Sequence, residues 1–256
     1  MKPEKGLKVS VAGKGGAGKT TVAAALALAL RERGFEVFAV DGDSNSCLGH
    51  ALGFPDKDLA NLRPLSDMRE ELQRRAQPEG STMYSLTPPV DDLIEQYSLR
   101  RDGLSLLVMG TIDQGGSGCA CPLNATLREV LRQMVKRPEA VVVDLEAGVE
   151  HLGRGTAMAL DHMLIVTEPT EASIRTCNRI ARLAADIGVR RVAVLPNKIR
   201  SPEDVRRIGE GVQSLSVLEP VPYVENAPEV LTDGSAAARK LIDILGRVAE
   251  AIEAWS

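Results

Sequence analysis

Short apolar runs recur along the chain, and each one ends in polar or glycine residues. The runs cover residues 7–11, 36–40, 104–109, 140–143, 162–166, 191–195 and 217–221. Segments of this length, rich in β-branched residues, are typical of strands in a parallel sheet that helices cover on both faces. We therefore predict strands whose carboxyl ends form the ligand-binding edge of such a sheet.

Between these runs, apolar residues follow the spacing that marks one face of a helix. The clearest stripes are Val22, Leu26 and Leu30; Leu123, Leu127, Val130, Leu131 and Met134; Ile180, Leu183, Ala184 and Ile187; and Leu241, Leu245, Val248 and Ile252. The segment 54–89 is more polar and contains prolines, which predicts an irregular or helical excursion. Strands that alternate with helices predict a doubly wound α/β fold with a mainly parallel sheet, and we expect a single domain over residues 1–256.

Composition narrows the class of protein. Hydrophobic residues make up 44% of the chain but aromatic residues only 3%, so the core must be built from alanine, valine, leucine and isoleucine. The net charge of −4 gives no sign of a nucleic-acid-binding surface, and no stretch resembles a membrane span or a signal peptide. We expect a cytoplasmic protein without nucleic-acid or membrane partners, whose four cysteines bind metal or are buried rather than form disulfides.

A glycine-rich loop lies between the first predicted strand and the first predicted helix, and it fits the phosphate-binding P-loop pattern. Its residues are Gly13, Lys14, Gly15, Gly16, Ala17, Gly18, Lys19, Thr20 and Thr21. Glycines allow successive backbone N–H groups to turn toward phosphate oxygens, and the helix N-terminus adds partial positive charge. We expect Lys19 to reach the β- and γ-phosphates of ATP and the Thr20 hydroxyl to ligate Mg²⁺.

Lys14 gives the loop a second lysine, which is more positive charge than one triphosphate usually receives from its own P-loop. One geometry that uses it has Lys14 reach across a two-fold axis to the phosphates of a partner subunit, as an arginine finger does in trans. ATP would then join the two halves of a homodimer. The alternative is a solvated loop lysine, because exposure is the ordinary state of lysine.

Two further predicted strands end in acidic loops. Asp41 and Asp43 follow the second strand. We assign Asp43 to orient or deprotonate the attacking water. For Asp41, a functional role and a helix cap or turn fit equally well. The run 140–143 ends in Asp144, a pattern that indicates a Mg²⁺-supporting carboxylate. Gly148 follows, and its backbone N–H is a candidate contact for the γ-phosphate in a loop that senses hydrolysis.

Asn197 and Lys198 follow the predicted strand 191–195, and we place them on the adenine side of the bound nucleotide. The asparagine amide offers one donor and one acceptor to the edge of a purine. A turn after Pro196 explains the same residues almost as well.

Cys119 and Cys121 form a Cys-x-Cys pair between glycines and Pro122. Proline suits the first position of the helix that follows, which puts Cys121 at its cap, where the helix N-terminus favours the metal-binding thiolate. Two sulfurs are half of a closed soft-metal site, so a two-fold dimer would supply four, suited to Zn²⁺ in a tetrahedron or Ni²⁺ in a square plane. Two small buried residues or a labile redox pair are the alternatives. Cys47 and Cys177 are isolated, and we expect both to pack in the interior; for Cys47, which follows the Asp43 loop, nucleotide sensing is the alternative.

Taken together, these motifs resemble a known family. The loop Gly-Lys-Gly-Gly-Ala-Gly-Lys-Thr-Thr at 13–21 is similar to the deviant Walker A loop of the MinD/ParA-type ATPases, the nitrogenase iron protein and the metal-insertion ATPases. Three further stretches narrow the resemblance to the CooC-type nickel-insertion accessory ATPases of carbon monoxide dehydrogenase. They are Val-Asp-Gly-Asp-Ser-Asn-Ser-Cys-Leu-Gly at 40–49, Cys-Ala-Cys-Pro at 119–122 and Asp-Leu-Glu-Ala-Gly-Val-Glu-His-Leu-Gly-Arg-Gly at 144–155.

The resemblance covers nearly the whole chain and implies an ATPase that uses ATP and Mg²⁺ and forms a homodimer when ligand is bound. It also implies that Ni²⁺ (or Zn²⁺) is held between the subunits at the cysteine pair, with carbon monoxide dehydrogenase as the client. Hydrolysis, using Asp43, Lys14 and Lys19, would relax the switch loops and change the sulfur geometry.

Three other functions fit parts of the sequence. A partitioning or positioning ATPase would bind DNA or membrane, but residues 249–256 are acidic and lack the basic amphipathic helix of membrane-binding relatives. An iron–sulfur carrier would use the same four thiolates for a cluster. A nucleotide-dependent binding switch would need no metal, and replacing both cysteines would leave its function intact.

Overall fold

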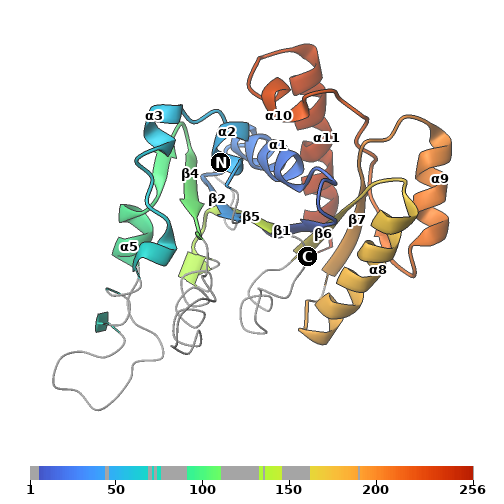
Figure 1. Ribbon diagram of the computed structural model, residues 1–256, viewed down its shortest axis with the longest axis horizontal. Helices are drawn as coiled ribbons and strands as arrows, with labels where there is room; N and C mark the ends of the chain where they lie inside the picture. The colour runs from blue at the N-terminus through green and yellow to red at the C-terminus, as the bar shows by residue number, and fades with distance from the viewer. Residues whose placement is uncertain are drawn as a thin grey trace.

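The computed structural model describes residues 6–43, 46–68, 71, 74–75, 91–110, 133–134, 136–145, 162–189 and 191–255. Within these residues, eight strands form one sheet in the order β3-β4-β2-β5-β1-β6-β7-β8 (Figure 1). Neighbouring strands pair in parallel, except that β3 is antiparallel to β4. The predicted α/β architecture with a mainly parallel sheet is confirmed.

Most of the predicted strands lie where the apolar runs placed them. The strands are β1 (Lys8–Gly13), β2 (Val37–Gly42), β3 (Leu99–Arg101), β4 (Leu104–Val108), β5 (Ala140–Leu145), β6 (His162–Thr167), β7 (Arg191–Pro196) and β8 (Ser216–Val217). The run 217–221 is a strand only at its start, because Pro220 and Pro222 lack the N–H groups that a longer ladder requires. β3 has no counterpart among the runs, since two of its three residues are arginines.

Helices cover both faces of the sheet (Figure 1). They are α1 (Lys19–Glu32), α2 (Leu48–Ala51), α3 (Asp56–Leu59), the 3₁₀ helix η1 (Leu65–Met68), α5 (Asp91–Gln96), α8 (Glu171–Asp186), α9 (Pro202–Gly211), α10 (Ala227–Val230) and α11 (Ala236–Glu253). The helices α1 and α11 pack together over one face, whereas α5, α8 and α9 contribute to the core on the other.

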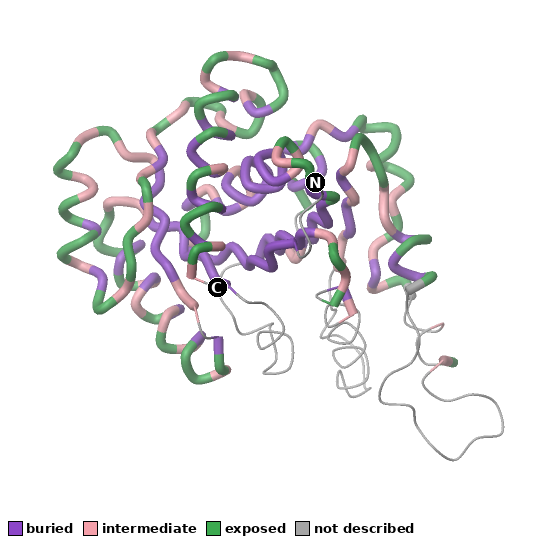
Figure 2. The backbone as a smooth tube through the Cα atoms, turned by 180° about the vertical axis from the view of Figure 1, so that it is seen from behind, coloured by how far each residue is buried: buried purple, intermediate pink, exposed green. Residues whose placement is uncertain are grey.

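The sheet separates two apolar cores, and successive residues of a strand face alternate cores. In β5, Val142 belongs to the core beneath α1 and α11, while Val141 and Val143 belong to the core on the α8 side. Figure 2 shows the central strands and α1 as mostly buried, whereas the edge strands β3 and β8 are largely exposed. The predicted stripes of α1 and α11 are buried as expected, and so are Ile180 and Ala184 of α8. The stripe 123–134 lies outside the described residues except for Met134, which is buried.

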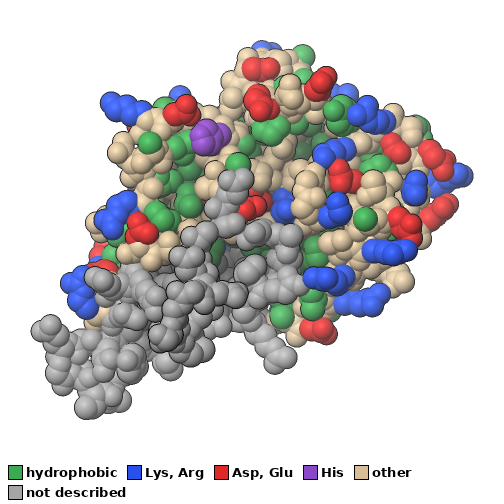
Figure 3. Space-filling model, in the orientation of Figure 1, with side chains coloured by type: hydrophobic (Ala, Val, Ile, Leu, Met, Phe, Trp, Pro, Cys, Tyr) green, Lys and Arg blue, Asp and Glu red, His purple; other side chains and the backbone are tan. Residues whose placement is uncertain are grey.

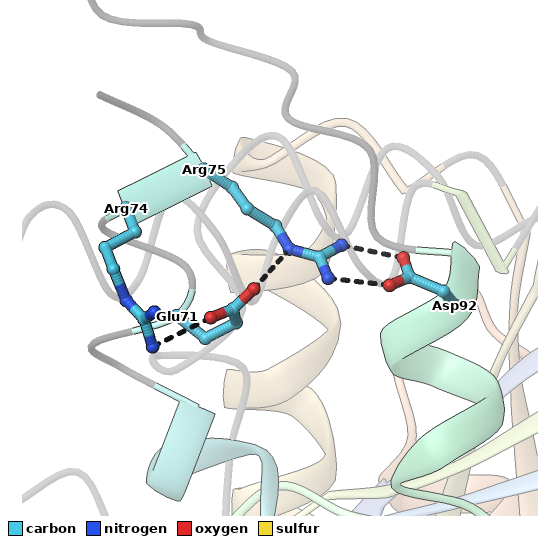
Figure 4. Close-up of polar contacts among 4 residues, drawn as sticks. All are labelled: Glu71, Arg74, Arg75 and Asp92. Atoms are coloured by element: carbon cyan, nitrogen blue, oxygen red, sulfur yellow. Dashed lines mark hydrogen bonds and ion pairs between the residues drawn. The ribbon is translucent and has the colours of Figure 1, made fainter. Parts of the chain in front are cut away.

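The segment 54–89 contains the short helices α3 and η1 in its described part. Further along, Arg75 binds Glu71 at 2.9 Å and Asp92 of α5 at 2.6 Å, and Arg74 lies 2.9 Å from Glu71 (Figure 4). The Arg75–Asp92 ion pair thus connects the polar segment 54–89 to α5. Among the described residues, no helix is both long enough and apolar enough to cross a membrane.

Candidate functional site

The predicted P-loop joins the end of β1 to the start of α1. Gly16 and Gly18 have positive φ angles of 79° and 93°, and Gly18 is the residue that precedes α1. A Cβ at Gly18 would lie 2.5 Å from Nδ2 of Asn197, so the close approach of the two loops requires glycine. Lys19, the first residue of α1, is buried, whereas Lys14 is half-buried.

The side chains of Asn197 and Lys198 bind the backbone of this loop. Asn197 Nδ2 donates a hydrogen bond to the carbonyl oxygen of Ala17 at 2.8 Å. Lys198 Nζ donates to the carbonyl oxygen of Gly16 at 2.6 Å and lies 2.8 Å from Oε1 of Glu168. Both residues, which the sequence predicted to lie beside the adenine, thus contact the P-loop backbone.

A cavity of about 320 Å³ opens beside the P-loop. Its polar lining comes from the P-loop and from Asn197 and Lys198, and its apolar lining comes from α1, from the segment 221–228 and from Leu241 and Leu245 of α11. A concave site with apolar walls and a few convergent polar groups suits a nucleotide base and its sugar. The segment 221–228 was not among the predicted site residues, although its prolines at 222 and 228 are typical of a loop.

Two aspartates meet at the carboxyl ends of β2 and β5. The strands pair so that Asp41 is the direct neighbour of Asp144, and the two side chains are 0% and 1% exposed. Burial is the largest cause that raises the pKa of Asp144, and with the charges of Asp41 and Asp43 it brings the pKa to about 7, although Thr20 and Lys19 act to lower it. The Thr20 hydroxyl is near enough to lower this pKa, yet neither carboxylate oxygen accepts a hydrogen bond of regular geometry.

Two unsatisfied buried oxygens beside a threonine hydroxyl suit a hard cation with oxygen ligands. The residues present therefore fit the Mg²⁺ that the P-loop implies: Thr20 and Asp144 would hold it, and Lys19 would remain available to phosphate. When bound, the ion would neutralise phosphate charge during hydrolysis.

Asp41 holds the loop that carries Asp43. Its Oδ1 accepts from the backbone N–H of Asp43 at 3.1 Å, and its Oδ2 accepts from Ser46 Oγ at 2.7 Å and from the N–H of Leu48 at 3.0 Å. Asp41 itself lies within β2, and the residue that precedes α2 is Cys47, so the carboxylate of Asp41 reaches the first N–H of α2 from the neighbouring strand rather than as the cap residue. Burial raises the pKa of Asp41, while these hydrogen bonds lower it.

The cysteines divide into three groups. Cys119 and Cys121, like Gly148, lie outside the described residues. Cys177 is buried, as predicted, but Cys47 is exposed, so the expectation that it packs in the interior is wrong. Cys47 lies instead near the acidic loop. Partial desolvation of its thiol and the charges of Asp41, Asp43 and Asp144 raise the pKa of that thiol. Within the described part of the chain, no three His, Cys, Asp or Glu side chains are grouped to bind a metal ion.

Charges of both signs are mixed over α8 and α9. Figure 3 shows basic side chains interspersed with acidic ones on this side of the molecule. Arg175 pairs with Glu171, and Arg206 pairs with Glu203 at 2.7 Å. The charge of these helices is thus largely compensated within each helix.

The P-loop, the paired aspartates and the adjoining cavity, at the carboxyl edge of a parallel sheet, define a P-loop nucleoside triphosphatase. A family model described as the CobQ/CobB/MinD/ParA nucleotide binding domain matches residues 8–236. The chain belongs to this family and is an ATPase.

Individual relatives support the same assignment. The chain is 40% identical to the carbon monoxide dehydrogenase accessory protein CooC of Rhodospirillum rubrum over 85% of its length and 84% of that protein. It is 39% identical to an uncharacterised ATP-binding protein of Methanocaldococcus jannaschii, covering 86% of each chain.

Solved structures show the same fold at low sequence identity. A ParA family ATPase from Chlorobium tepidum superposes with a TM-score of 0.69 at 18% identity, covering 93% of this chain and 98% of that one. The septum site-determining protein MinD of Pyrococcus horikoshii, complexed with Mg-ADP, superposes with a TM-score of 0.64 at 20% identity, covering 94% of both chains.

Proposed function

We propose that this ATPase is a metallochaperone that assists nickel insertion into carbon monoxide dehydrogenase. The observation that carries the proposal is the 40% identity to CooC over most of both chains, together with the Cys119-Ala120-Cys121 motif. CooC is by its name an accessory protein of that dehydrogenase. We infer that this chain works in the cytoplasm, where thiols remain reduced.

In the proposed mechanism, ATP joins two copies of the single domain formed by residues 1–256. Gly13 to Thr21 bind the phosphates, and Lys14 reaches the phosphates bound by the partner. Asp43, in the loop that Asp41 holds, would orient the attacking water at the γ-phosphate. Thr20 and Asp144 would hold Mg²⁺, and Gly148 would sense the γ-phosphate.

The metal is the cargo of this proposed cycle. Cys119 and Cys121 from each subunit would provide four thiolates for one Ni²⁺ or Zn²⁺ on the two-fold axis. Loss of the γ-phosphate would release the switch loops, change the spacing of the sulfurs and free the metal for the dehydrogenase.

Anaerobic nickel titration of the reduced protein, with oligomeric mass measured in parallel, tests this function. We expect one nickel per dimer, and we expect Cys119→Ser with Cys121→Ser to abolish binding while ATP hydrolysis continues. The matched control is Cys177→Ser, which changes a cysteine remote from the pair in sequence. Unchanged nickel binding in the double variant would exclude the cysteine site.

The same samples separate the remaining functions. Visible absorption after anaerobic reconstitution with iron and sulfide would favour the iron–sulfur carrier. ATP-dependent pelleting with DNA or liposomes would favour a partitioning-type ATPase; the mixed charges of α8 and α9 give that function no support. Transfer of nickel from the loaded dimer to apo carbon monoxide dehydrogenase would establish the client.

A further inference from the structure

Lys198 was expected to bind nucleotide, but its ammonium contacts protein groups. Its ammonium is shared between the carbonyl oxygen of Gly16 and the carboxylate of Glu168, at 2.6 and 2.8 Å. Glu168 directly follows β6; its side chain is 17% exposed and that of Lys198 is 38% exposed, so the ion pair is partly shielded from solvent on the side of the acid. The contacts direct the charge of Lys198 toward the P-loop backbone.

Holding the Gly16 carbonyl also fixes the rest of its peptide group, because the peptide unit is planar. The same unit contains the N–H of Ala17, which donates to the carbonyl oxygen of Lys14 at 3.0 Å. That bond closes a turn over residues 14–17, in which Gly16 has a φ of 79°. Lys198 therefore acts, through one peptide group, on the turn that carries Lys14.

The stem of Lys198 has a separate role from its ammonium. Its Cε lies 4.0 Å from the position that a Cβ would take on Gly18, and the residue lines the cavity beside the P-loop. Lys198 has a φ of 59°, a left-handed conformation that residues with a Cβ seldom adopt and that surrounding contacts must maintain. The stem thus forms part of the cavity wall while the ammonium faces the loop.

We propose that Lys198 and Glu168 are a positioning pair for ATP hydrolysis. The ammonium holds the turn of residues 14–17, and the carboxylate holds the ammonium in place. Lys198 thereby acts on the phosphates through the P-loop rather than as a direct ligand, and Lys14 and Lys19 remain as the cations for phosphate. A turn held before nucleotide binds avoids reorganisation during the reaction. This inference depends on the ATPase activity and not on nickel.

Four variants separate the ammonium from the stem. Lys198→Met keeps the length of the stem without the charge, Lys198→Arg keeps the charge, and Glu168→Gln keeps the shape of the acid. Lys57→Met, at an exposed lysine of α3, is the matched control. For each full-length protein, kcat and KM for ATP, the Kd for ADP and the thermal unfolding midpoint are measured.

We expect Lys198→Met to lower kcat about tenfold while the Kd for ADP changes less than about twofold, because the stem and Asn197 remain. Glu168→Gln should lower kcat about threefold, and adding it to Lys198→Met should cause no further loss, as for residues that act as one unit. Lys198→Arg should restore most of the rate, and Lys57→Met should match the wild type.

A direct phosphate ligand would behave differently. Lys198→Met would then weaken ADP and ATP binding by the same factor with kcat unchanged, and that result would overturn the proposal. Additive losses from Glu168→Gln and Lys198→Met would overturn it as well. If Lys198→Met fails to fold, Lys198→Arg combined with Glu168→Gln carries the test: a guanidinium without its carboxylate should be slower than Lys198→Arg alone.

Discussion

Asp144 is an acid whose surroundings favour its neutral form until a cation is present. It is 1% exposed, and its pKa is raised to about 7. Its paired residue on the adjacent strand β2 is Asp41, which is also buried. Burying this carboxyl group lowers the folding stability of the metal-free protein, a cost that is common at residues that serve a ligand site. The position predicts how stability changes with pH.

In metal-free protein, the free energy of unfolding contributed by Asp144 should fall as pH rises from about 4 to about 7, because the folded state keeps a proton that the unfolded state has released. Asp144→Asn should remove this dependence. The variant should match the wild type near pH 4 and be more stable by roughly 2–4 kcal/mol at pH 8. Urea denaturation at several pH values, without Mg²⁺, measures the difference.

Asp58→Asn, at an exposed acid of α3, is the control for this prediction and should follow the wild type at every pH. A difference between Asp144→Asn and the wild type that stays constant with pH would contradict the assigned protonation state.

Asp43 should affect the rate of hydrolysis rather than the binding of ATP. Its backbone N–H is fixed by Asp41 Oδ1, so replacing the side chain leaves the loop anchored. We expect Asp43→Asn to lower kcat by about a hundredfold or more, the range typical of a lost general base, with KM for ATP nearly unchanged. Steady-state phosphate release measures both constants, and Asp67→Asn on η1 is the control. A normal kcat would assign the base to another group.

Single residues were predictable from the sequence where a motif fixes their place. The P-loop residues and Asp144 lie next to one another as the strand and loop pattern implied. The contacts of Asn197 and Lys198 with the P-loop were not predictable, because they join residues about 180 positions apart through side-chain geometry. The exposure of Cys47 was missed for a related reason: apolar composition does not show that its loop faces outward.

At the scale of elements, the close pairing of β2 and β5 keeps the acidic loops together. Gly42 ends β2, and a Cβ there would lie 2.8 Å from the carbonyl oxygen of Asp144. The backbones approach so closely that a methyl group must separate the strands. Glycine at this position therefore supports the alignment of Asp41 with Asp144.

We expect Gly42→Ala to lower the free energy of unfolding by about 1–3 kcal/mol, as overpacking does in a core, and to reduce ATP hydrolysis. The matched control is Gly209→Ala in α9, where nothing lies within 4 Å of the added methyl. That variant should be more stable by about 0.5–1 kcal/mol, because alanine is the better helix former. Equal stability changes at the two sites would show that the strand spacing is adaptable.

Elements with a strong period were predictable, and short polar ones were not. The stripes of α1, α8 and α11 coincide with helices, and six apolar runs coincide with strands. Pairing with β4 makes Leu99–Arg101 a strand although the segment has no apolar pattern of its own. In the opposite direction, prolines shortened the strand expected at 217–221, which shows that local backbone chemistry can outweigh hydrophobicity.

For the whole molecule, the central question is how two copies meet. Lys14 is half-buried at the nucleotide edge of the sheet, which is where the proposed dimer would form. A non-hydrolysable ATP analogue should convert monomer into dimer, and Lys14→Ala should weaken the dimer by about tenfold or more, as expected when a buried interfacial charge contact is lost. Analytical ultracentrifugation with ATP analogue and with ADP measures the shift.

Lys57→Ala is the control for the dimer and should assemble as the wild type does. If Lys14→Ala dimerised and hydrolysed ATP normally, Lys14 would be a solvated loop lysine and the interface would lie elsewhere.

The short strands at the two ends of the described sheet limit how copies of this protein can associate. β3 has three residues and β8 has two, so each end offers few backbone groups to an incoming strand. Extending the sheet from one molecule into the next would gain little, which disfavours open-ended fibres. The two-fold contact proposed for the loop face would instead be closed and would end at a particle of fixed size.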